Sequence, residues 1–351
     1  MKPALKTIAL CELKLCRNRM IELLEGKRRP GERLPDTGQE PTAPPLTSST
    51  TESICALAKL LLCRSRTAMV TSWIGRNHLS QPMGAPEGGR PEGTGNTLRN
   101  MRLIDVHAHL EELTDLPQAL SEAKTEGVKG IVAVGMDLNS NARTLEIAEE
   151  NPGYVYAALG YHPWEIRPDG VDEGLSFIGK HISECVALGE IGLDYKAKVK
   201  KDLQWKVFGA LLDLACAHDK PVIIHCRYSH ERALEMISER QIKKAVFHWY
   251  VGSLHLLERI VEKGYLISAT PALRYSPFHQ QAVLRAPLER ILLETDTPVK
   301  YEGHEARPKD VSISLQEVAR LKQLDPLVVA EQTTDNACHF FQIPHPSRLG
   351  S

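Results

Sequence analysis

The 351-residue sequence lacks long apolar runs and paired cysteine motifs. No apolar stretch approaches the roughly 18 residues that a membrane-spanning helix needs. The start of the chain contains Glu12 and has no clean signal-peptide core. A mitochondrial presequence is an open alternative, although its acidic residues count against it. The eight cysteines form no CxxC pair, which favours a reducing compartment. We therefore expect a cytoplasmic protein without membrane contact.

The chain also lacks a strong net charge, because its formal balance is −1. Residues 1–100 carry 15 Lys and Arg against 9 Asp and Glu, whereas residues 101–351 carry 28 against 35. Proteins that bind nucleic acid through a broad basic groove are rarely acidic in this way. A phosphate ligand would therefore have to be held at a localised site. The Gly-rich fingerprints of dinucleotide and P-loop sites are missing as well.

Two parts of unlike composition make up the chain. Residues 30–100 are rich in Pro, Gly, Ser and Thr, as in "PGERLPDTGQEPTAPPLTSS" and "SQPMGAPEGGRPEGTGN". Such segments bury too little apolar surface to offset the loss of chain entropy on folding. We expect residues 1–100 to be a largely disordered extension and residues 101–351 to form the folded domain.

From residue 102 onward, β-rich runs alternate with helical ones. Strands are expected at 102–107, 130–135, 154–160, 185–192, 221–226, 244–249, 265–270 and 290–296, each followed by a helix, with a last helical run at 326–337. Strands that alternate with helices predict a parallel sheet with right-handed crossovers. Eight such units at this length favour a (β/α)₈ TIM barrel, an α/β fold. An open doubly wound sheet is the alternative.

Polar residues gather where these strands end, and in such a barrel the carboxyl ends of the strands form the active-site face. Imidazole and carboxylate groups are the usual ligands of divalent metal ions. Each residue alone could be a structural polar group, but together they are too many for one tetrahedral ion and suit two ions that share a carboxylate. The six candidate metal ligands are His107, His109, Glu190, His225, His248 and Asp296.

The motifs "DVHAHL", "GYHP", "GEIGLDY", "IIHCR", "FHW" and "LLETDTP" occur in the order typical of the TatD family. The sequence from about residue 102 to 342 resembles this family of metal-dependent hydrolases, which belongs to the amidohydrolase superfamily and has a distorted TIM barrel. The resemblance implies deoxyribonuclease activity at DNA 3′ ends. It also implies two divalent ions, with Mg²⁺ expected and Mn²⁺ or Zn²⁺ as alternatives.

The resemblance further implies how the ligands are divided. His107, His109, Glu190 and Asp296 would hold one ion, and Glu190 would bridge to a second ion completed by His225 and His248. We expect Asp296 to accept a proton from the attacking water and Glu190 to set the spacing of the ions, so both are candidate catalytic residues.

Further residues are candidates for supporting roles. His162 and Arg227 are expected to contact substrate, with Arg227 as a phosphate clamp. Asp105 is expected to orient a ligand imidazole from behind. Aromatic residues on the rim could stack on a base or simply pack against the barrel; they are Trp164, Trp249 and Tyr250.

The chain departs from the family around the metal ligands. Trp164 stands where family members often have a second His after "GxHP", and "HWYVGS" and "IHCRYSH" replace "HCFSG" and "IHSRDA". These changes bear on the substrate more than on the reaction type. The partner is therefore a nucleic-acid 3′ end or a small phosphoester, while an amide or ester hydrolase and a catalytically silent metal-binding scaffold are the alternatives. The sequence carries no signal for an oligomeric state.

Overall fold

The computed structural model describes residues 101–347 of the chain. The expected disorder of residues 1–100 lies outside these residues and stays a prediction. Within the described part, no helix has the length and apolar character needed to cross a bilayer. The four cysteines of this part are free thiols.

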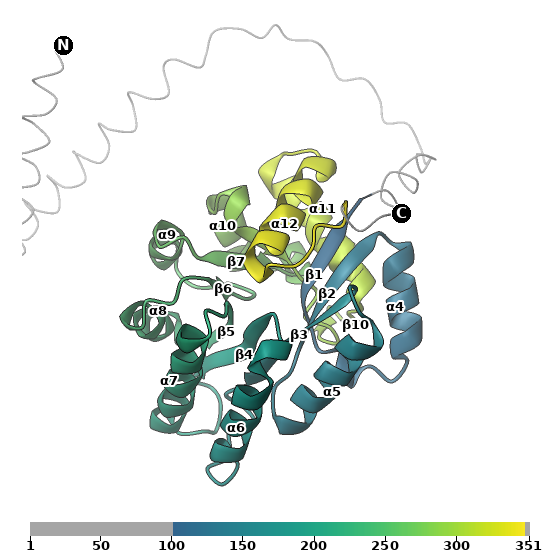
Figure 1. The fold of residues 1–351 in the computed structure, drawn as a ribbon. Helices are drawn as coiled ribbons and strands as arrows, with labels where there is room; N and C mark the ends of the chain where they lie inside the picture. Colours follow the sequence, from purple (N-terminus) through teal and green to yellow (C-terminus); the bar gives the residue numbers. More distant parts are fainter. Residues whose placement is uncertain (1–100, 348–351) are drawn as a thin grey trace, which may run out of the picture. The chain divides into compact units, whose positions relative to one another are not determined.

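Eight parallel strands form one sheet in the order of the sequence, β1 to β8 (Figure 1). This sequential order confirms the predicted TIM barrel, because a doubly wound sheet would place later strands on both sides of the first. The strands are β1 Leu103–Ala108, β2 Val128–Val134, β3 Val155–Tyr161, β4 Ala187–Asp194, β5 Val222–Arg227, β6 Ala245–Phe247, β7 Leu266–Ala269 and β8 Ile291–Leu293.

Helices follow the strands and surround the barrel (Figure 1). Several begin at clear start signals: Asp137 caps α5 by accepting the backbone N–H of Ser140 at 2.8 Å, and Pro326 opens α12. The α-helices are α4 Leu116–Thr125, α5 Leu138–Glu150, α6 Val171–His181, α7 Lys201–Ala217, α8 His230–Glu239, α9 Leu254–Glu262, α10 Pro277–Arg285, α11 Val311–Lys322 and α12 Pro326–Phe341.

Short elements complete the connections. Five 3₁₀ turns and a two-stranded ribbon lie in the loops of the described chain, and the ribbon follows β8. These elements are η1 Leu110–Glu112, η2 Ile182–Glu184, η3 Pro271–Arg274, η4 Leu288–Arg290, η5 Pro308–Asp310, β9 Lys300–Tyr301 and β10 His304–Glu305.

One apolar cluster contains residues from all eight strands, together with Phe340 and Phe341 of α12. A single cluster can contact every strand only inside the barrel, so these side chains fill the barrel interior on the side that α12 covers. Lys244, just before β6, donates a hydrogen bond to the carbonyl of His339 at 3.1 Å. Helix α12 therefore covers the amino ends of the strands, which leaves the carboxyl ends as the open face.

The barrel closes through the segment that follows β8. The backbone N–H of Asp296 donates to the carbonyl of His107, and the N–H of His109 donates to the carbonyl of Thr297, both at 2.9 Å. Asp105 accepts two further bonds from Thr295, one from its backbone N–H at 2.9 Å and one from its hydroxyl at 2.6 Å. The contact between the first and last strands, which closes the barrel, is therefore made by residues at the open face.

Candidate metal centre

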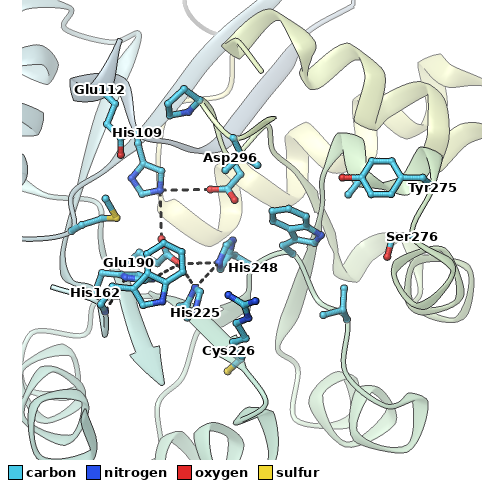
Figure 2. Close-up of a pocket in the computed structure, with 18 residues that line it drawn as sticks. His109, Glu112, His162, Glu190, His225, Cys226, His248, Tyr275, Ser276 and Asp296 are labelled. Atoms are coloured by element: carbon cyan, nitrogen blue, oxygen red, sulfur yellow. Dashed lines mark hydrogen bonds and ion pairs between the residues drawn. The ribbon is translucent and has the colours of Figure 1, made fainter. Parts of the chain in front are cut away.

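Glu190 lies in the middle of a group of imidazoles at the open face of the barrel (Figure 2). Its Oε1 is 2.6 Å from Nδ1 of His225 and 2.8 Å from Nε2 of His248. Its Oε2 is 3.3 Å from Nε2 of His107 and 3.5 Å from Nε2 of His109. Each carboxylate oxygen therefore faces a different pair of imidazoles.

Asp296 joins the pair from β1. Its Oδ1 lies 3.4 Å from Nε2 of His107 and 3.6 Å from Nε2 of His109, and these two ring nitrogens are 3.3 Å apart. Asp296 has a φ of 55°, a left-handed conformation that Asp tolerates better than most residues. The backbone hydrogen bond to His107 holds this conformation, so barrel closure also places the carboxylate.

His162 lies on the other side of Glu190, at the end of β3. Its Nε2 is 3.5 Å from Oε1 of Glu190, and its ring meets that of His225 edge to face at 4.4 Å between centroids. The side chain is almost fully buried. Burial lowers the pKa of His162 to about 4, so the ring is neutral at physiological pH.

The electrostatics of the centre favour bound positive charge. Burial raises the pKa of Glu190, but the surrounding imidazoles, led by His248, outweigh it and hold that pKa well below its ordinary range. For Asp296, burial is likewise outweighed by the hydrogen bond from His109 together with the charges of His107 and His248, and its pKa is lowered. Both carboxylates are therefore ionised at neutral pH and can serve as metal ligands.

Local packing brings Glu190 to this position. A Cβ added at Gly160 of β3 would lie 2.3 Å from the carbonyl oxygen and 2.4 Å from the nitrogen of Glu190, so only glycine allows β3 and β4 to approach so closely. Asn141 of α5 fixes the backbone of Gly160 by accepting its N–H at 2.9 Å and donating to its carbonyl at 2.7 Å.

An outer layer of acceptors, not anticipated as a group from the sequence, contacts the far nitrogens of two imidazoles. Nδ1 of His109 is 3.1 Å from the carbonyl of Val134, and Nε2 of His225 is 3.3 Å from Oδ2 of Asp194. The indole N–H of Trp164 donates to the same Oδ2 at 2.6 Å. In the sequence, only the position of Asp194 in the "GEIGLD" motif indicates that this residue lies near the centre.

Asp105 differs from its expected role. Its carboxylate contacts Thr295 and the backbone N–H of His107, the latter at 3.4 Å, while Nδ1 of His107 has no hydrogen-bond partner among the described residues. Asp105 therefore supports the main chain on both sides of the barrel closure instead of bonding to an imidazole. The β1–β2 register shifts between Asp105 and Ala108, which interrupts the simple strand alternation on which the expectation rested.

A pocket of about 650 Å³ opens over the centre, and His109, His162, Glu190, His225, His248 and Asp296 line it. Arg227, at the end of β5, reaches the same pocket. Trp164 and Trp249 line it too, but Tyr250 does not. Of the two alternatives for Tyr250, packing holds and base stacking does not, because its side chain is fully buried and its hydroxyl donates to the carbonyl of Ser253 at 2.7 Å.

The donor set fits divalent ions. His107, His109 and Asp296 form one group of side chains whose ligand atoms lie within 4.8 Å of one another, and His162, Glu190 and His225 form another. Neutral imidazole nitrogens and ionised carboxylates are suitable ligands for such ions. The six candidate ligands, which come from β1, β4, β5, the end of β6 and the segment after β8, are thus brought together at one end of the barrel.

Comparison with known proteins agrees with this site. The family model for TatD-related DNases matches residues 104–342. The chain belongs to the TatD family of metal-dependent hydrolases. The "Uncharacterized metal-dependent hydrolase YabD" of Bacillus subtilis is 32% identical over 256 residues, which cover 69% of this chain and 99% of YabD. The "3′-5′ ssDNA/RNA exonuclease TatD" of Yersinia pseudotuberculosis is 30% identical over 263 residues, which cover 69% of this chain and all of that protein.

Solved structures of TatD proteins have the same fold. The crystal structure of the TatD homologue YJJV from Escherichia coli aligns with a TM-score of 0.64 and 28% identity, covering 70% of this chain and 99% of YJJV. A TatD-family hydrolase from Entamoeba histolytica aligns with a TM-score of 0.61 at 22% identity, covering 68% of this chain and 98% of that protein, which supports the fold. The family match lies within the described barrel, so residues 1–100 fall outside it.

Proposed function

We propose that this TatD-family chain is a deoxyribonuclease that hydrolyses phosphodiester bonds at DNA 3′ ends with two divalent ions. The observation that carries the proposal is the position of Glu190, whose two carboxylate oxygens face separate imidazole pairs. A carboxylate shared between two ligand sets can hold two ions at the short separation of a two-metal hydrolytic site. A relative that is named a 3′-5′ ssDNA/RNA exonuclease supports a nucleic acid as the substrate.

The proposed ligands divide at Glu190. His107, His109 and Asp296 would hold one ion with Oε2 of Glu190, and His225 and His248 would hold the other with Oε1. Mg²⁺ is our first choice of ion, with Mn²⁺ or Zn²⁺ as alternatives. When bound, such ions lower the pKa of a water molecule and polarise a phosphoryl oxygen.

Asp296 is the proposed proton acceptor. Its carboxylate lines the pocket, and the hydrogen bond from His109 helps to keep its pKa low despite burial, so it is ionised and able to take a proton. The left-handed backbone and the hydrogen bond to His107 hold its oxygens toward the imidazoles of β1. Glu190 is the proposed spacer between the two ligand sets.

Substrate contacts are proposed for the wall of the pocket. Arg227 extends from β5 into the pocket, where its guanidinium could hold two oxygens of one phosphate group. His162 is neutral and buried beside Glu190, so it can position a polar group of the substrate without adding charge. Trp164 is 53% exposed while its indole N–H is bonded to Asp194, which leaves a fixed aromatic side chain for a base.

Metal analysis and a substrate screen test the proposal together. The protein loaded with Mg²⁺ or Mn²⁺ should hold two ions and cleave single-stranded DNA and an aryl phosphodiester faster than an aryl ester. His225→Ala and His248→Ala should each retain one ion, because the ligands from β1 and Asp296 remain. Either variant holding two ions would contradict the ligand assignment, and a preference for the aryl ester would favour the amide or ester hydrolase alternative.

A further inference from the structure

A second cluster of polar atoms lies beneath the candidate metal ligands. The ligand-capable atoms of His107, His248 and Glu294 come within 4.8 Å of one another, and all three side chains are buried. The two imidazole rings stack at 4.4 Å between centroids with 16° between their planes. Glu294 follows β8 directly and does not line the substrate pocket. Within the cluster, Glu294 and His107 are therefore set back from the surface that a substrate reaches, whereas His248 also lines the pocket.

Three atoms of this cluster have no hydrogen-bond partner among the described residues: Nδ1 of His107, Nδ1 of His248 and Oε2 of Glu294. A buried polar atom without a partner destabilises the fold, so three in one place call for an explanation. Two of them are ring nitrogens that can donate, and the third is a carboxylate oxygen that can only accept when ionised. They are complementary to one another.

Both imidazoles present their other nitrogen to the metal centre. Nε2 of His107 faces Glu190 and Asp296 at 3.3 and 3.4 Å, and Nε2 of His248 is 2.8 Å from Glu190. A neutral imidazole that offers Nε2 as a metal ligand must carry its hydrogen on Nδ1. Each ring therefore needs an acceptor on its Nδ1 side.

Glu294 is placed to be that acceptor for both rings. Its Oε1 accepts the backbone N–H of Trp249 at 3.0 Å and lies 3.5 Å from Nδ1 of His248. Its Oε2 has no other partner and is available to His107. We propose that Glu294 is a positioning residue whose single carboxylate fixes the metal-binding tautomer of His107 and His248 together.

This role rests on the proposed two-ion function and extends it. His107 and His248 belong to different ligand sets, so one buried side chain would govern the affinity of both ions. The other acceptors in the outer layer each serve one ring: Asp194 lies behind His225, and the carbonyl of Val134 lies behind His109. Carboxylates behind metal-binding imidazoles commonly change metal affinity about 10–100-fold when they are removed.

Glu294→Gln separates positioning from simple packing. The amide oxygen can still accept the N–H of Trp249 and stay near Nδ1 of His248, which turns the amide NH₂ toward His107. That NH₂ donates and would pair with an unprotonated Nδ1, which favours the Nε2–H tautomer that cannot bind metal through Nε2. The substitution keeps the volume of the side chain, so it should not create a cavity.

The test combines histidine tautomers with metal affinity. In wild-type protein loaded with diamagnetic Mg²⁺, nitrogen-15 NMR should show Nδ1–H for both His107 and His248. Glu294→Gln should shift His107 toward Nε2–H, leave His248 as Nδ1–H because its Nδ1 still faces the amide oxygen, and weaken Mn²⁺ binding at the ion of His107 roughly 10–100-fold in a calorimetric titration. Asp194→Asn should weaken only one ion, because it contacts only His225 among the ligands.

Asp105→Asn is the matched control, because it also alters a buried carboxylate near the centre. Asp105 contacts main chain and Thr295, so its loss should lower stability without changing either tautomer. Nε2–H tautomers in the Mg²⁺-loaded wild type would overturn the role of Glu294 even if Glu294→Gln failed to fold. So would a folded Glu294→Gln variant with unchanged tautomers. A wild type that bound only one ion would instead contradict the proposed function.

Discussion

At the scale of single residues, Asp296 and Glu190 occupy different environments although both are buried carboxylates of one centre. Glu190 contacts imidazoles with both oxygens, whereas Asp296 contacts the β1 pair through one oxygen. Oδ2 of Asp296 is therefore freer to contact a water molecule or a substrate. This difference is why we assign the spacing role to Glu190 and the proton to Asp296.

Asp296→Asn should keep the fold and most of the bound metal but lower turnover about 10²–10⁴-fold, the range expected when general-base help is lost. An amide oxygen can still bind an ion, but an amide has no basic lone pair near neutrality. Turnover of a nucleotide phosphodiester at saturating Mg²⁺ or Mn²⁺, with metal content measured in parallel, checks this. Glu294→Gln at the same saturating metal should lose less rate and more stability. Near-normal turnover of metal-replete Asp296→Asn would exclude Asp296 as the base.

His279 of α10 should make the stability of the fold sensitive to acid, independently of the metal ligands. Its ring is fully buried between the carbonyl of Tyr250 at 2.9 Å and the N–H of Thr270 at 3.1 Å, and burial lowers its pKa from 6.5 to about 4. The unfolded chain therefore binds a proton here between about pH 6.5 and 4 while the folded chain does not. The corresponding stability is complete above pH 6.5 and is lost as pH falls toward 4, by about 3 kcal/mol.

His279→Gln tests this, because glutamine has both a donor and an acceptor but does not titrate. The free energy of unfolding of the metal-free protein, measured by urea at pH 7.5 and 4.5, should fall less between the two pH values in the variant than in the wild type. The remaining acid sensitivity, shared by both proteins, cancels in this comparison. Equal losses would show that His279 does not titrate as its burial indicates.

At the scale of structural elements, the contact between β3 and β4 decides where Glu190 stands. Gly160→Ala would place a methyl group against the backbone of Glu190, which has no room to yield because Ile191, the next residue, is paired in register with Ile224 of β5. We expect a loss of stability and a loss of metal binding at both ligand sets. Thermal melting and metal content after loading are the measurements.

Gly179→Ala in α6 is the control for this prediction. A Cβ there would meet only the side chain of Leu214 at 4.0 Å, and alanine favours a helix over glycine by up to about 1 kcal/mol. The control should be neutral or more stable, with unchanged metal content. If Gly160→Ala bound metal like the control, the close approach of β3 to β4 would not be what positions Glu190.

The elements themselves were predictable because each one has a local signal. Strand and helix periods alternate eight times, and the observed bounds differ from the expected ones by a few residues, as for β6, which ends at Phe247 instead of residue 249. No pattern in the neighbouring sequence predicts the contacts that complete the centre. Asp194 bonds to His225 and Trp164, and Glu294 contacts His248, only because the fold places distant residues side by side. The burial of Tyr250 is likewise a tertiary effect.

At the scale of the whole molecule, residues 101–347 contain a complete eight-stranded ring and the entire candidate centre. We therefore predict that a chain beginning at Met101 folds and acts without residues 1–100. Its cooperative melting transition and its turnover should match those of the full-length protein. Loss of the cooperative transition on truncation would show that residues 1–100 belong to the folded unit.

The closure of the barrel has a consequence for the biosynthesis of the enzyme. Asp105 and Thr295, which bond across the seam, are 190 residues apart, and Asp296 follows at once. A nascent chain on the ribosome therefore carries an incomplete ligand set until the last strand has emerged and docked against the first. Assembly of the final strand and completion of the candidate hydrolytic centre would be one event. Partly synthesised chains would then be unable to hydrolyse a substrate.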